Sequence, residues 1–544
     1  MFNKKQRNIG LLFGLIATFV PVAWIEFNVL RYTKGSFIYP VDDTFIHLEL
    51  ANNLANYGVW GINSHEFASA SSSLLYTLIL SLFTKIFSSG VLLPFAVNVI
   101  AGILFLVVIN NWLAKQQLST NAIVWVNLLL SFFTPLPVLI ISGMEHTLQC
   151  LFTFLFVFYS CEWIAKSRQD DSSQKFLWRI AIYGMLLTAI RYEGLFLVGV
   201  ICLVYLYYKK WSAAIKIGAI SILPVVVFGL YSVLKRSYFL PNSVLIKSNE
   251  VPLFGGGIAH FFQTLFVEKL TLSTSGITAM ATQRLLLILP AIYLLFLKQL
   301  KSNLYYTIVL VTLTLATLLH LSLASTGKFY RYEAYLIESS IIISATIFLK
   351  YWKEILSYKS LFTSLVAAFL FFFLLFPVVL RSTAAFSKAQ RACINIYEQQ
   401  YQMGHFLKKY YPNCAIAAND IGAVAYYTKG NVVDLWGLGS FEVSKSRRDR
   451  YWSPGFLDML CKQKNVKLAV IYDSWFNDGF ANKWEKVATW KIQDNVVCGD
   501  DTVSFYAVDG KSAPELEQHL REFESELPKT IEIKYYQPQA IPNE

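Results

Sequence analysis

Apolar stretches long enough to cross a bilayer recur along the first two thirds of the chain, and they restrict its fold more than any other feature. A spanning helix needs roughly 20 apolar residues, within a range of about 17 to 25. By this measure the sequence predicts about eleven spans, at residues 8–29, 91–112, 120–141, 146–165, 176–191, 193–208, 213–234, 282–298, 303–323, 334–350 and 361–381. The first follows the basic segment MFNKKQR without a small-residue cleavage site, so we expect a retained helix.

The composition agrees with a chain solvated largely by lipid. Hydrophobic residues make up 55% of the 544 residues and charged residues only 15%, whereas a soluble domain carries about 25% charged residues. The formal net charge is +12, but Lys and Arg lie between apolar stretches, where they set topology and meet phosphate head groups. The lipid bilayer is therefore an expected partner, and nucleic acid is a poor one.

The distribution of Lys and Arg among the loops predicts the orientation. With a cytoplasmic N-terminus, the basic loops AKQQ, AKSRQDDSSQKFLWR, YYKKW, LKQLKSN and KYWKEILSYKS all become cytoplasmic, as the positive-inside rule requires. This holds only if the apolar stretch 71–87 does not cross, since a crossing would turn most of the basic loops outward. We therefore expect residues 71–87 to form a juxtamembrane or re-entrant helix on the outer side.

The last 160 or so residues change character. CAIAANDIG, NVVDLWG and VKLAVIYD are typical of short buried strands, and FLDMLCKQKN is typical of a helix. We predict a transmembrane domain at 1–383 and an extracytoplasmic α/β domain at 384–544. Four cysteines, Cys393, Cys414, Cys461 and Cys498, lie in the second domain, and the sequence permits either disulfides or buried thiols there.

Two adjacent carboxylates, Asp42 and Asp43, follow the first span. They begin an amphipathic helical pattern in which Asp43, His47, Leu50 and Leu54 share one face. Adjacent carboxylates beside a low-dielectric boundary repel each other and raise at least one pKa, as a general base near neutrality requires. The alternative is that one Asp merely caps the helix.

Further charges interrupt the apolar stretches. Arg191 and Glu193 lie within LLTAIRYEGLFLVGV, and Lys328, Arg331 and Glu333 interrupt 303–350. Such residues are costly at membrane depth unless they face a cavity, an interface or each other, so they suggest function, although a structural ion pair or snorkelling is the alternative. On the predicted topology one outer face collects Asp42, Asp43, Glu145, His146, Arg191, Glu193, Lys235, Arg236, Lys247, Lys328 and Arg331.

This mixture of acids and surplus cations fits an anionic ligand held at lipid depth. Cations bind a lipid-linked phosphate while apolar helices hold the lipid tail. A nearby carboxylate then takes a proton from an acceptor hydroxyl as its oxygen attacks a sugar carbon and phosphate leaves. No P-loop or GxGxxG follows a predicted strand, and FGGGIAH (254–260) is expected to be a flexible loop.

An ordered set of segments resembles a known family. VDDTFIHLELANNLANYG is followed in order by ASASSSLLYTLIL, SGMEHTL, RYEG, LPNSVLIKS and KFYRYEAYL. The set resembles bacterial integral-membrane glycosyltransferases of the GT-C superfamily, in the branch with polyprenyl-phosphate-sugar donors that is akin to mycobacterial arabinofuranosyltransferases. The resemblance implies a GT-C-type polytopic α-helical protein of the bacterial inner membrane, with about eleven spans, juxtamembrane helices in the first outer loop and a periplasmic α/β domain.

The resemblance also implies roles for individual residues. Asp43 would be the catalytic base, with Asp42 as its partner or as a metal ligand. The donor phosphate would meet Arg191, Lys247, Arg331, Tyr332 and Lys328, while the sugar and acceptor pocket would use Glu145, His146, Glu193 and His47. RYEG stands where relatives often have Arg-Pro-Glu-Gly, so the local helix break lacks its proline.

The expected function is sugar transfer from a polyprenyl-phosphate donor to a cell-envelope glycan or lipid acceptor on the outer face. Some superfamily members use a divalent cation, and Asp42, Asp43 and Glu145 could offer oxygen ligands to Mg²⁺ or Mn²⁺. A transporter or flippase of lipid-linked substrates is the alternative, but it predicts inverted repeats, and none is visible. A receptor-like glycan-binding module would need only one or two anchoring helices.

Overall fold

Two compact units make up the described chain. The computed structural model describes residues 4–87, 90–167, 174–247, 276–301, 303–355, 361–476, 479–480 and 483–537. Unit 1 comprises Met1–Trp24, Phe95–Val227 and Lys247–Ser387, and unit 2 comprises Ile25–Pro94, Phe228–Ile246 and Lys388–Glu544. The segment that carries the acid pair therefore folds with the C-terminal residues.

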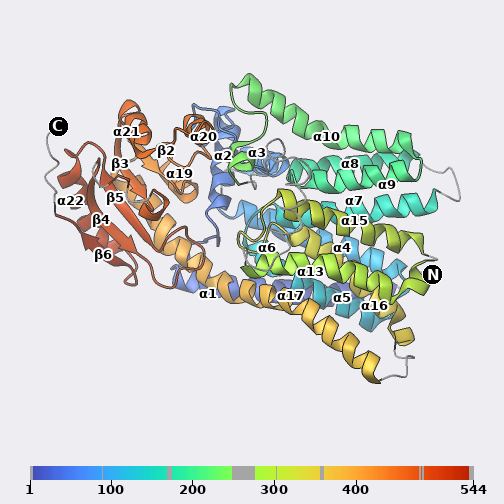
Figure 1. Ribbon diagram of the computed structural model, residues 1–544. Helices are drawn as coiled ribbons and strands as arrows, with labels where there is room; N and C mark the ends of the chain where they lie inside the picture. Colours follow the sequence, from blue (N-terminus) through green and yellow to red (C-terminus); the bar gives the residue numbers. More distant parts are fainter. Residues whose placement is uncertain are drawn as a thin grey trace. The chain divides into compact units, whose positions relative to one another are not determined.

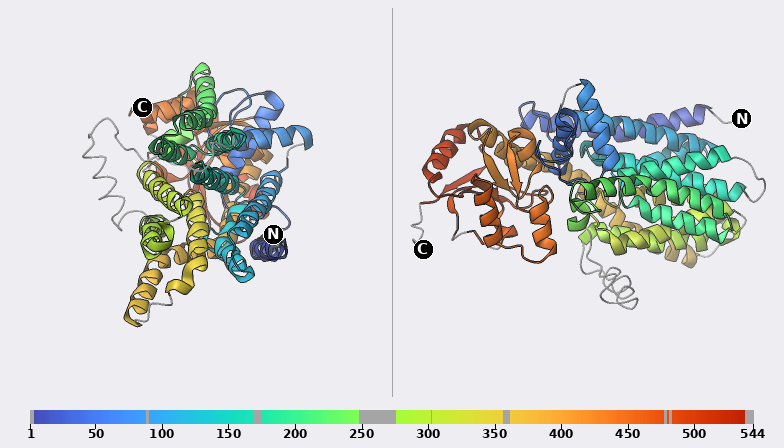
Figure 2. Two further views of the ribbon diagram at one scale, coloured as in Figure 1. Left: turned by 90° about the vertical axis from the view of Figure 1, so that its right-hand side faces the viewer. Right: turned by 90° about the horizontal axis from the view of Figure 1, so that it is seen from above.

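Unit 1 consists of helices that lie side by side (Figures 1 and 2). Helices α7, α15 and α16 contact one another, α7 also contacts α8 and α9, and α15 also contacts α9 and α13. The helices are α1 (Lys4–Tyr32), α4 (Leu93–Lys115), α5 (Thr120–Phe133), α6 (Leu136–Ile141), α7 (His146–Lys166), α8 (Gln174–Ile190), α9 (Gly194–Tyr207), α10 (Trp211–Leu234), α13 (Gly276–Leu295), α14 (Leu297–Leu300), α15 (Leu304–Leu323), α16 (Ala334–Ile355) and α17 (Leu361–Ile396), of which α1, α4, α10 and α17 each have residues in both units.

The helices confirm a multi-pass membrane protein, although not a count of eleven spans. Within the described residues, eight helices are long and apolar enough to cross a bilayer. The remaining predicted spans fall on shorter helices, α5 and α9 with 14 residues each and α8 with 17. The expected span 120–141 is interrupted at Pro135, between α5 and α6, because proline has no N–H to continue a helix.

The apolar stretch 71–87 forms helix α3 (Leu74–Phe87), which has 14 residues and belongs to unit 2. It packs against α2 (Asp43–Tyr57), the helix that follows the acid pair. Its length is below the roughly 17 residues that a span requires. A location at the membrane surface stays a prediction.

The C-terminal part of unit 2 is an α/β fold with one six-stranded sheet, in the order β2-β1-β3-β5-β4-β6. Strand β1 runs parallel to β2 and β3, and the remaining pairs are antiparallel. The elements are α18 (Gln402–Tyr410), β1 (Ala415–Ala418), α19 (Gly422–Thr428), β2 (Asn431–Asp434), α20 (Phe441–Arg448), α21 (Pro454–Gln463), β3 (Val466–Ile471), β4 (Glu485–Lys491), β5 (Thr502–Ala507), α22 (Ala513–Phe523) and β6 (Glu532–Tyr535); Asn242–Lys247 forms the short helix α11 outside the sheet. The three predicted strands are β1, β2 and β3.

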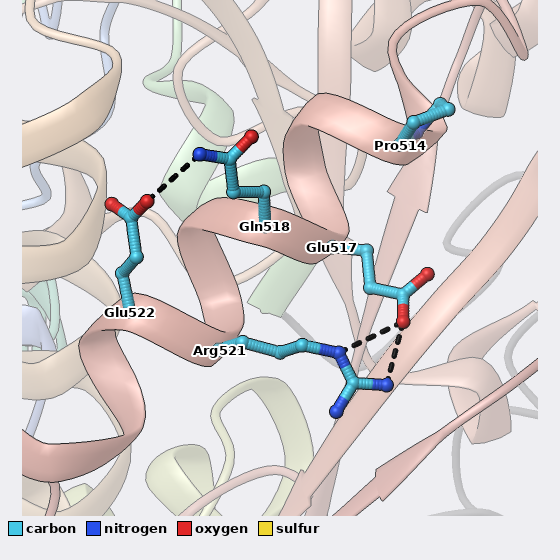
Figure 3. A pocket seen from close by; sticks show the side chains of 5 residues that line it. All are labelled: Pro514, Glu517, Gln518, Arg521 and Glu522. Carbon is cyan, nitrogen blue, oxygen red and sulfur yellow. Dashed lines mark hydrogen bonds and ion pairs between the residues drawn. The ribbon is translucent and has the colours of Figure 1, made fainter.

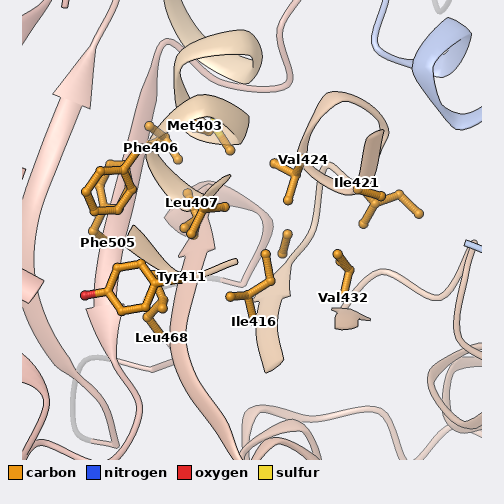
Figure 4. Close-up of a cluster of buried hydrophobic side chains, with 14 of the residues drawn as sticks. Met403, Phe406, Leu407, Tyr411, Ile416, Ile421, Val424, Val432, Leu468 and Phe505 are labelled. Atoms are coloured by element: carbon orange, nitrogen blue, oxygen red, sulfur yellow. The ribbon is translucent and has the colours of Figure 1, made fainter. Parts of the chain in front are cut away.

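One of the two hydrophobic clusters on the sheet of unit 2 packs it against α2, α18 and α19 (Figure 4). Phe406 of α18 packs against Phe505 of β5 at a ring separation of 5.6 Å. Ile46 and Leu50 of α2 belong to the same buried cluster. The apolar face of α2 is therefore covered by the C-terminal residues, and this contact fixes where the acid pair lies in unit 2.

All seven cysteines are free in the structure. Cys393 and Cys461 are buried, while Cys414 and Cys498 are half-buried. Of the two possibilities that the sequence left open, the structure shows the thiols.

Candidate functional site

Asp42 is anchored to the start of a helix in the C-terminal part of unit 2. Its Oδ2 accepts a hydrogen bond from the Gly422 backbone N–H at 2.6 Å, and its Oδ1 accepts one from Ala423 at 2.7 Å. These N–H groups belong to the first turn of α19, where helical backbone donors have no partner in the helix itself. Asp42 stands at the N-cap position of α2, but its side chain does not cap that helix.

Gly422 makes this contact possible because it has no side chain. A Cβ at this position would overlap the backbone oxygen of Asp42 and would lie 2.7 Å from its Cγ. The segment NDIG therefore ends in a glycine that lets the Asp42 loop seat directly on the backbone. The close approach explains why two segments 380 residues apart in sequence meet here.

A buried polar network continues from this contact. Asp420 Oδ2 accepts from Gln400 Nε2 at 2.8 Å, and the Tyr472 hydroxyl donates to Gln399 Oε1 at 2.7 Å. Gln399 and Gln400 lie in a π-helical turn, Tyr397–Tyr401, between α17 and α18. Such single turns widen a helix locally and are frequent at functional sites. Here the turn directs both amides toward the carboxyl ends of β1 and β3.

Burial raises the pKa of Asp42 well above its usual value, and the nearby Asp420 carboxylate raises it further. The two backbone N–H donors work in the opposite direction by favouring the charged form. Asp42 is therefore held beside a second carboxylate in a place where ionisation is unfavourable. A like-charge effect on the pKa of Asp42 therefore exists, and Asp420 of the C-terminal domain is its main source.

Asp43 is the more accessible member of the pair. It is half-buried in the first turn of α2, where a negative charge is favoured by the helix dipole. His47 lies one turn further along and is buried, with Nδ1 3.3 Å from Thr77 Oγ1 of α3 and 3.3 Å from Ser71 Oγ. His47 thus packs between α2 and α3, and its expected role in the acceptor pocket stays a prediction.

In unit 1, Arg191 joins two of the predicted acids. Its Nη1 donates to Glu145 Oε1 at 2.8 Å, and its Nε donates to Glu193 Oε2 at 3.0 Å. Arg191 and Glu145 are both buried. Arg191 follows the end of α8 and Glu145 precedes α7, so the pair ties two helix ends together.

Aromatic and basic groups surround this ion pair. The Tyr332 ring lies 4.9 Å from the Arg191 guanidinium and 5.4 Å from that of Arg331. The His146 ring stacks on the Tyr332 ring, with centroids 5.7 Å apart and an angle of 13° between the ring planes. Cations within about 6 Å of an aromatic ring are attracted to it. The structure thus brings together five of the predicted unit 1 residues: Glu145, His146, Arg191, Glu193 and Tyr332.

The loop that carries Arg331 and Tyr332 has an unusual backbone. Lys328, Phe329 and Tyr330 have φ values of 43°, 63° and 61°, in the left-handed region, which costs about 1–2 kcal/mol per residue. Arg331 Nε donates to the Lys328 carbonyl at 2.7 Å, which holds this turn together. Lys328 itself is exposed.

Arg381 and Glu333 support the same loop. Arg381 Nε donates to Glu333 Oε1 at 2.7 Å, and Arg381 also donates to the Tyr330 carbonyl. Glu333 Oε2 accepts from the Gly327 N–H at 2.8 Å. Both side chains are fully buried. This pair therefore fixes both ends of the left-handed segment.

Sequence reasoning did not assign roles to several of these residues. Arg381 ends the last predicted span, and a lone Arg inside such a run was the available signal. Asp420 and Gly422, within NDIG, carried no comparable signal because their importance depends on contact with Asp42. The Lys247 side chain and residues 254–260 lie outside the described residues.

Two of the three residues expected to offer oxygen ligands to a divalent cation already have partners. Both carboxylate oxygens of Asp42 accept backbone hydrogen bonds, and Glu145 pairs with Arg191. Within the described ranges, no group of three or more His, Cys, Asp or Glu side chains is arranged to hold a metal ion. The divalent cation stays a prediction, and we derive no step through it.

A shallow hollow on α22 is a surface feature (Figure 3). Glu517 pairs with Arg521, and Gln518 donates to Glu522 at 2.9 Å, both one helical turn apart. Such spacing is typical of the solvated face of a helix. We assign no function to this hollow.

The comparisons with known proteins concern the fold and one segment. Residues 394–506 match a family model described as a domain of unknown function (DUF8728). The structure is similar to that of ArnT from Cupriavidus metallidurans in the apo state, with 13% identity and a TM-score of 0.50, over 91% of this chain and 98% of ArnT. Archaeoglobus fulgidus oligosaccharyltransferase AglB, seen with an inhibitory peptide and a dolichol-phosphate, is similar at 12% identity and a TM-score of 0.49, over 99% of this chain and 76% of AglB. No curated protein sequence matches.

The likeness to ArnT is one of fold. The likeness extends over nearly the whole of both chains. At 13% identity this likeness shows a shared fold, and a polytopic helical fold with a C-terminal domain is what the resemblance in the sequence implied.

Proposed function

We propose that this protein transfers a sugar from a polyprenyl-phosphate-linked donor to a cell-envelope glycan or lipid acceptor. The observation that carries the proposal is that the two carboxylates of the acid pair have different environments. Asp42 is immobilised by two backbone N–H groups of α19, whereas Asp43 is half-buried at the start of α2. Because Asp42 is fixed to α19, it also fixes the position of the adjacent Asp43. A general base must be positioned in this way. The GT-C fold supports the same function.

In this proposal Asp43 acts as the base. Its carboxylate takes the proton of an acceptor hydroxyl while that oxygen forms a bond to the anomeric carbon of the donor sugar. The bond from that carbon to the phosphate oxygen breaks, and the polyprenyl phosphate leaves with the electron pair. General base catalysis of this kind contributes about 10²–10⁴-fold to a rate.

Unit 1 supplies the groups for the donor in this proposal. Arg191 already donates to Glu145 and Glu193, so its role is to hold these acids and Tyr332 in place around the sugar. Contact with the donor phosphate falls to Arg331 and Lys328, on the loop held by Arg381 and Glu333, and to Lys247. A rigid loop suits this role, because preorganised cations need no rearrangement as the leaving phosphate gains charge.

The proposed setting is the bacterial inner membrane. The N-terminus is cytoplasmic and the domain from residue 384 onward is extracytoplasmic, as the distribution of Lys and Arg predicts. Residues 1–383 then form the transmembrane domain, and transfer takes place on the outer face. The donor lipid and the acceptor would both reach the enzyme from that side.

The proposal is tested with the full chain in lipid nanodiscs, supplied with polyprenyl-phosphate pentoses and hexoses and with an envelope extract as acceptor. Asp43→Asn is expected to lower kcat/KM about 10²–10⁴-fold without changing the melting temperature. Asp494→Asn, an exposed position in unit 2, is the control and should leave transfer unchanged.

Near-normal transfer by Asp43→Asn would remove Asp43 from the base role. Movement of the lipid-linked sugar across vesicle membranes, with no transfer product, would instead favour the transporter. An accessibility scan of cysteines introduced at residues 71–90 tests the orientation separately.

A further inference from the structure

A polar cleft of about 250 Å³ lies in unit 2, away from Asp42. It opens among the C-terminal half of α2, the loop that follows it, the turn before β1 (residues 412–413) and the connection from α19 into β2 (residues 429–431). Asparagine dominates its lining, at positions 52, 53, 56, 63, 413 and 431. Six asparagines thus line one concave site, and they have different structural roles.

Two of the asparagines build the walls. Asn53 Nδ2 donates to the Gly61 and Ile62 carbonyls, both at 2.9 Å. Asn63 donates to the Val432 carbonyl at 3.1 Å and accepts from the Val432 N–H at 2.9 Å. Because β2 is the edge strand of the sheet, the Asn63 amide takes the place of a neighbouring strand. These bonds fix the shape of the cleft without a ligand.

The floor of the cleft offers polar atoms for a ligand. Asn52 is 4% exposed, and its Oδ1 has no hydrogen-bond partner within the described ranges of the chain. Its Nδ2 donates to Glu49 Oε2 at 3.4 Å, so the amide is oriented. Burial raises the pKa of Glu49 to about 7, although the hydrogen bond from Asn52 and the charge of Lys429 both act to lower this pKa. A buried acceptor without a partner is unfavourable by about 1–3 kcal/mol, and a ligand hydroxyl that reached this oxygen would remove that penalty.

The rim is polar as well and carries one aromatic ring. Asn56, Ser64 and Asn413 are exposed and line the opening. Tyr57 is 66% exposed although it is a large aromatic residue. An exposed ring with an apolar face beside amide donors and acceptors can stack on a ligand while the amides bind its polar edge.

We propose that this cleft binds a neutral sugar residue of the acceptor glycan. Sugar hydroxyls donate and accept hydrogen bonds, as amide side chains do, and the C–H face of a sugar ring packs on an aromatic side chain. An apolar ligand would leave the amides unpaired. A phosphate would find Lys429 but would also lie near Glu49. The inference rests on the proposed function, since it names what the transferase would hold as acceptor.

The test uses full-length protein in nanodiscs, with Asp43→Asn to block transfer. The probes are methyl glycosides of arabinose, glucose, galactose and N-acetylglucosamine, together with inorganic phosphate, followed by saturation-transfer NMR and calorimetry. At least one glycoside should bind, and Asn52→Ala and Tyr57→Ala should each weaken it about tenfold. Gln518→Ala, in the hollow on α22 (Figure 3), should not. Tyr57 is exposed, so its variant should fold normally.

Several outcomes would overturn the inference: binding of none of the glycosides, binding that survives both cleft variants, or displacement of the sugar by inorganic phosphate. The wild-type protein separates the two proposals. Transfer activity without glycoside binding in the cleft rejects the cleft as a sugar site but keeps the transferase. Binding in the cleft without any transfer activity keeps the sugar site and rejects the transferase.

Discussion

The two units stabilise buried charge in different ways. In unit 1, Arg191 pairs with Glu145 and Glu193, and Arg381 pairs with Glu333, so opposite charges from different segments neutralise each other. In unit 2, Asp42 lies near another acid, Asp420, and is held by backbone N–H groups. The Arg191 and Arg381 sites of unit 1 thus pair opposite charges, whereas the Asp42 site of unit 2 places two like charges close together.

This difference has a chemical consequence. A balanced ion pair is fixed in geometry and in protonation, so it suits a scaffold for binding a charged donor. A carboxylate near a second carboxylate resists ionisation, and its protonation responds to its surroundings. In the proposed function, the ion pairs of unit 1 hold the charged donor, and the carboxylates of unit 2 take part in proton transfer.

Arg381→Met is expected to have the largest effect on stability, because it leaves Glu333 buried without its cation. We expect a loss of about 3–5 kcal/mol, seen as a lower melting temperature of the protein in nanodiscs. The double variant Arg381→Met with Glu333→Leu should recover much of that loss. A single variant as stable as the wild type would show that the balance of charge in unit 1 is not what holds the loop.

Gly422→Ala should have the next largest effect. The added Cβ would overlap the Asp42 backbone and push the Asp42 loop away from α19. Such overpacking should lower the free energy of unfolding by about 1–3 kcal/mol. Transfer should fall as well, because Asp43 is displaced with Asp42. The control is Gly455→Ala, where a Cβ would meet only Ser453 Oγ at 4.0 Å. Normal stability and activity of Gly422→Ala would argue against the anchoring of Asp42.

Arg331→Ala tests whether unit 1 holds the donor. The loss of one cation should weaken donor binding about tenfold, or roughly 1.4 kcal/mol, with a smaller change in kcat. Steady-state kinetics and direct binding of a polyprenyl-phosphate sugar measure the two effects separately. Lys115→Ala, at an exposed site on α4, is the control. A defect confined to kcat would place Arg331 in the chemical step.

Asp420→Asn should have the smallest effect, visible in the pH dependence of stability. The pKa of Asp42 is raised in the folded state, so the stability it contributes is complete below its unfolded pKa of about 4 and is lost as pH rises through the folded value. Removing the Asp420 charge lowers the folded pKa of Asp42, so melting temperatures measured from pH 4 to 8 should fall less steeply. An unchanged dependence of melting temperature on pH would mean that the Asp420 charge does not raise the pKa of Asp42.

The sequence predicted much of the framework from local patterns. Apolar stretches identified the helices, and short β-rich runs identified β1, β2 and β3, because both signals depend only on neighbouring residues. Strands β4, β5 and β6 were not predicted. Charges in an apolar stretch led to Arg191 and Glu193, and the resemblance led to Glu145. The structure brings the three together, because a buried charge requires a partner.

Hydropathy and the order of short motifs were thus enough to identify the membrane character of the chain, the acid pair and the GT-C resemblance. Only the tertiary structure decided that Asp42 is anchored by Gly422 and Ala423, that Arg381 clamps the Arg331 loop, and that asparagines from distant segments form one cleft. Each of these features depends on contacts between residues far apart in the chain, and local sequence patterns do not predict which distant segments come into contact.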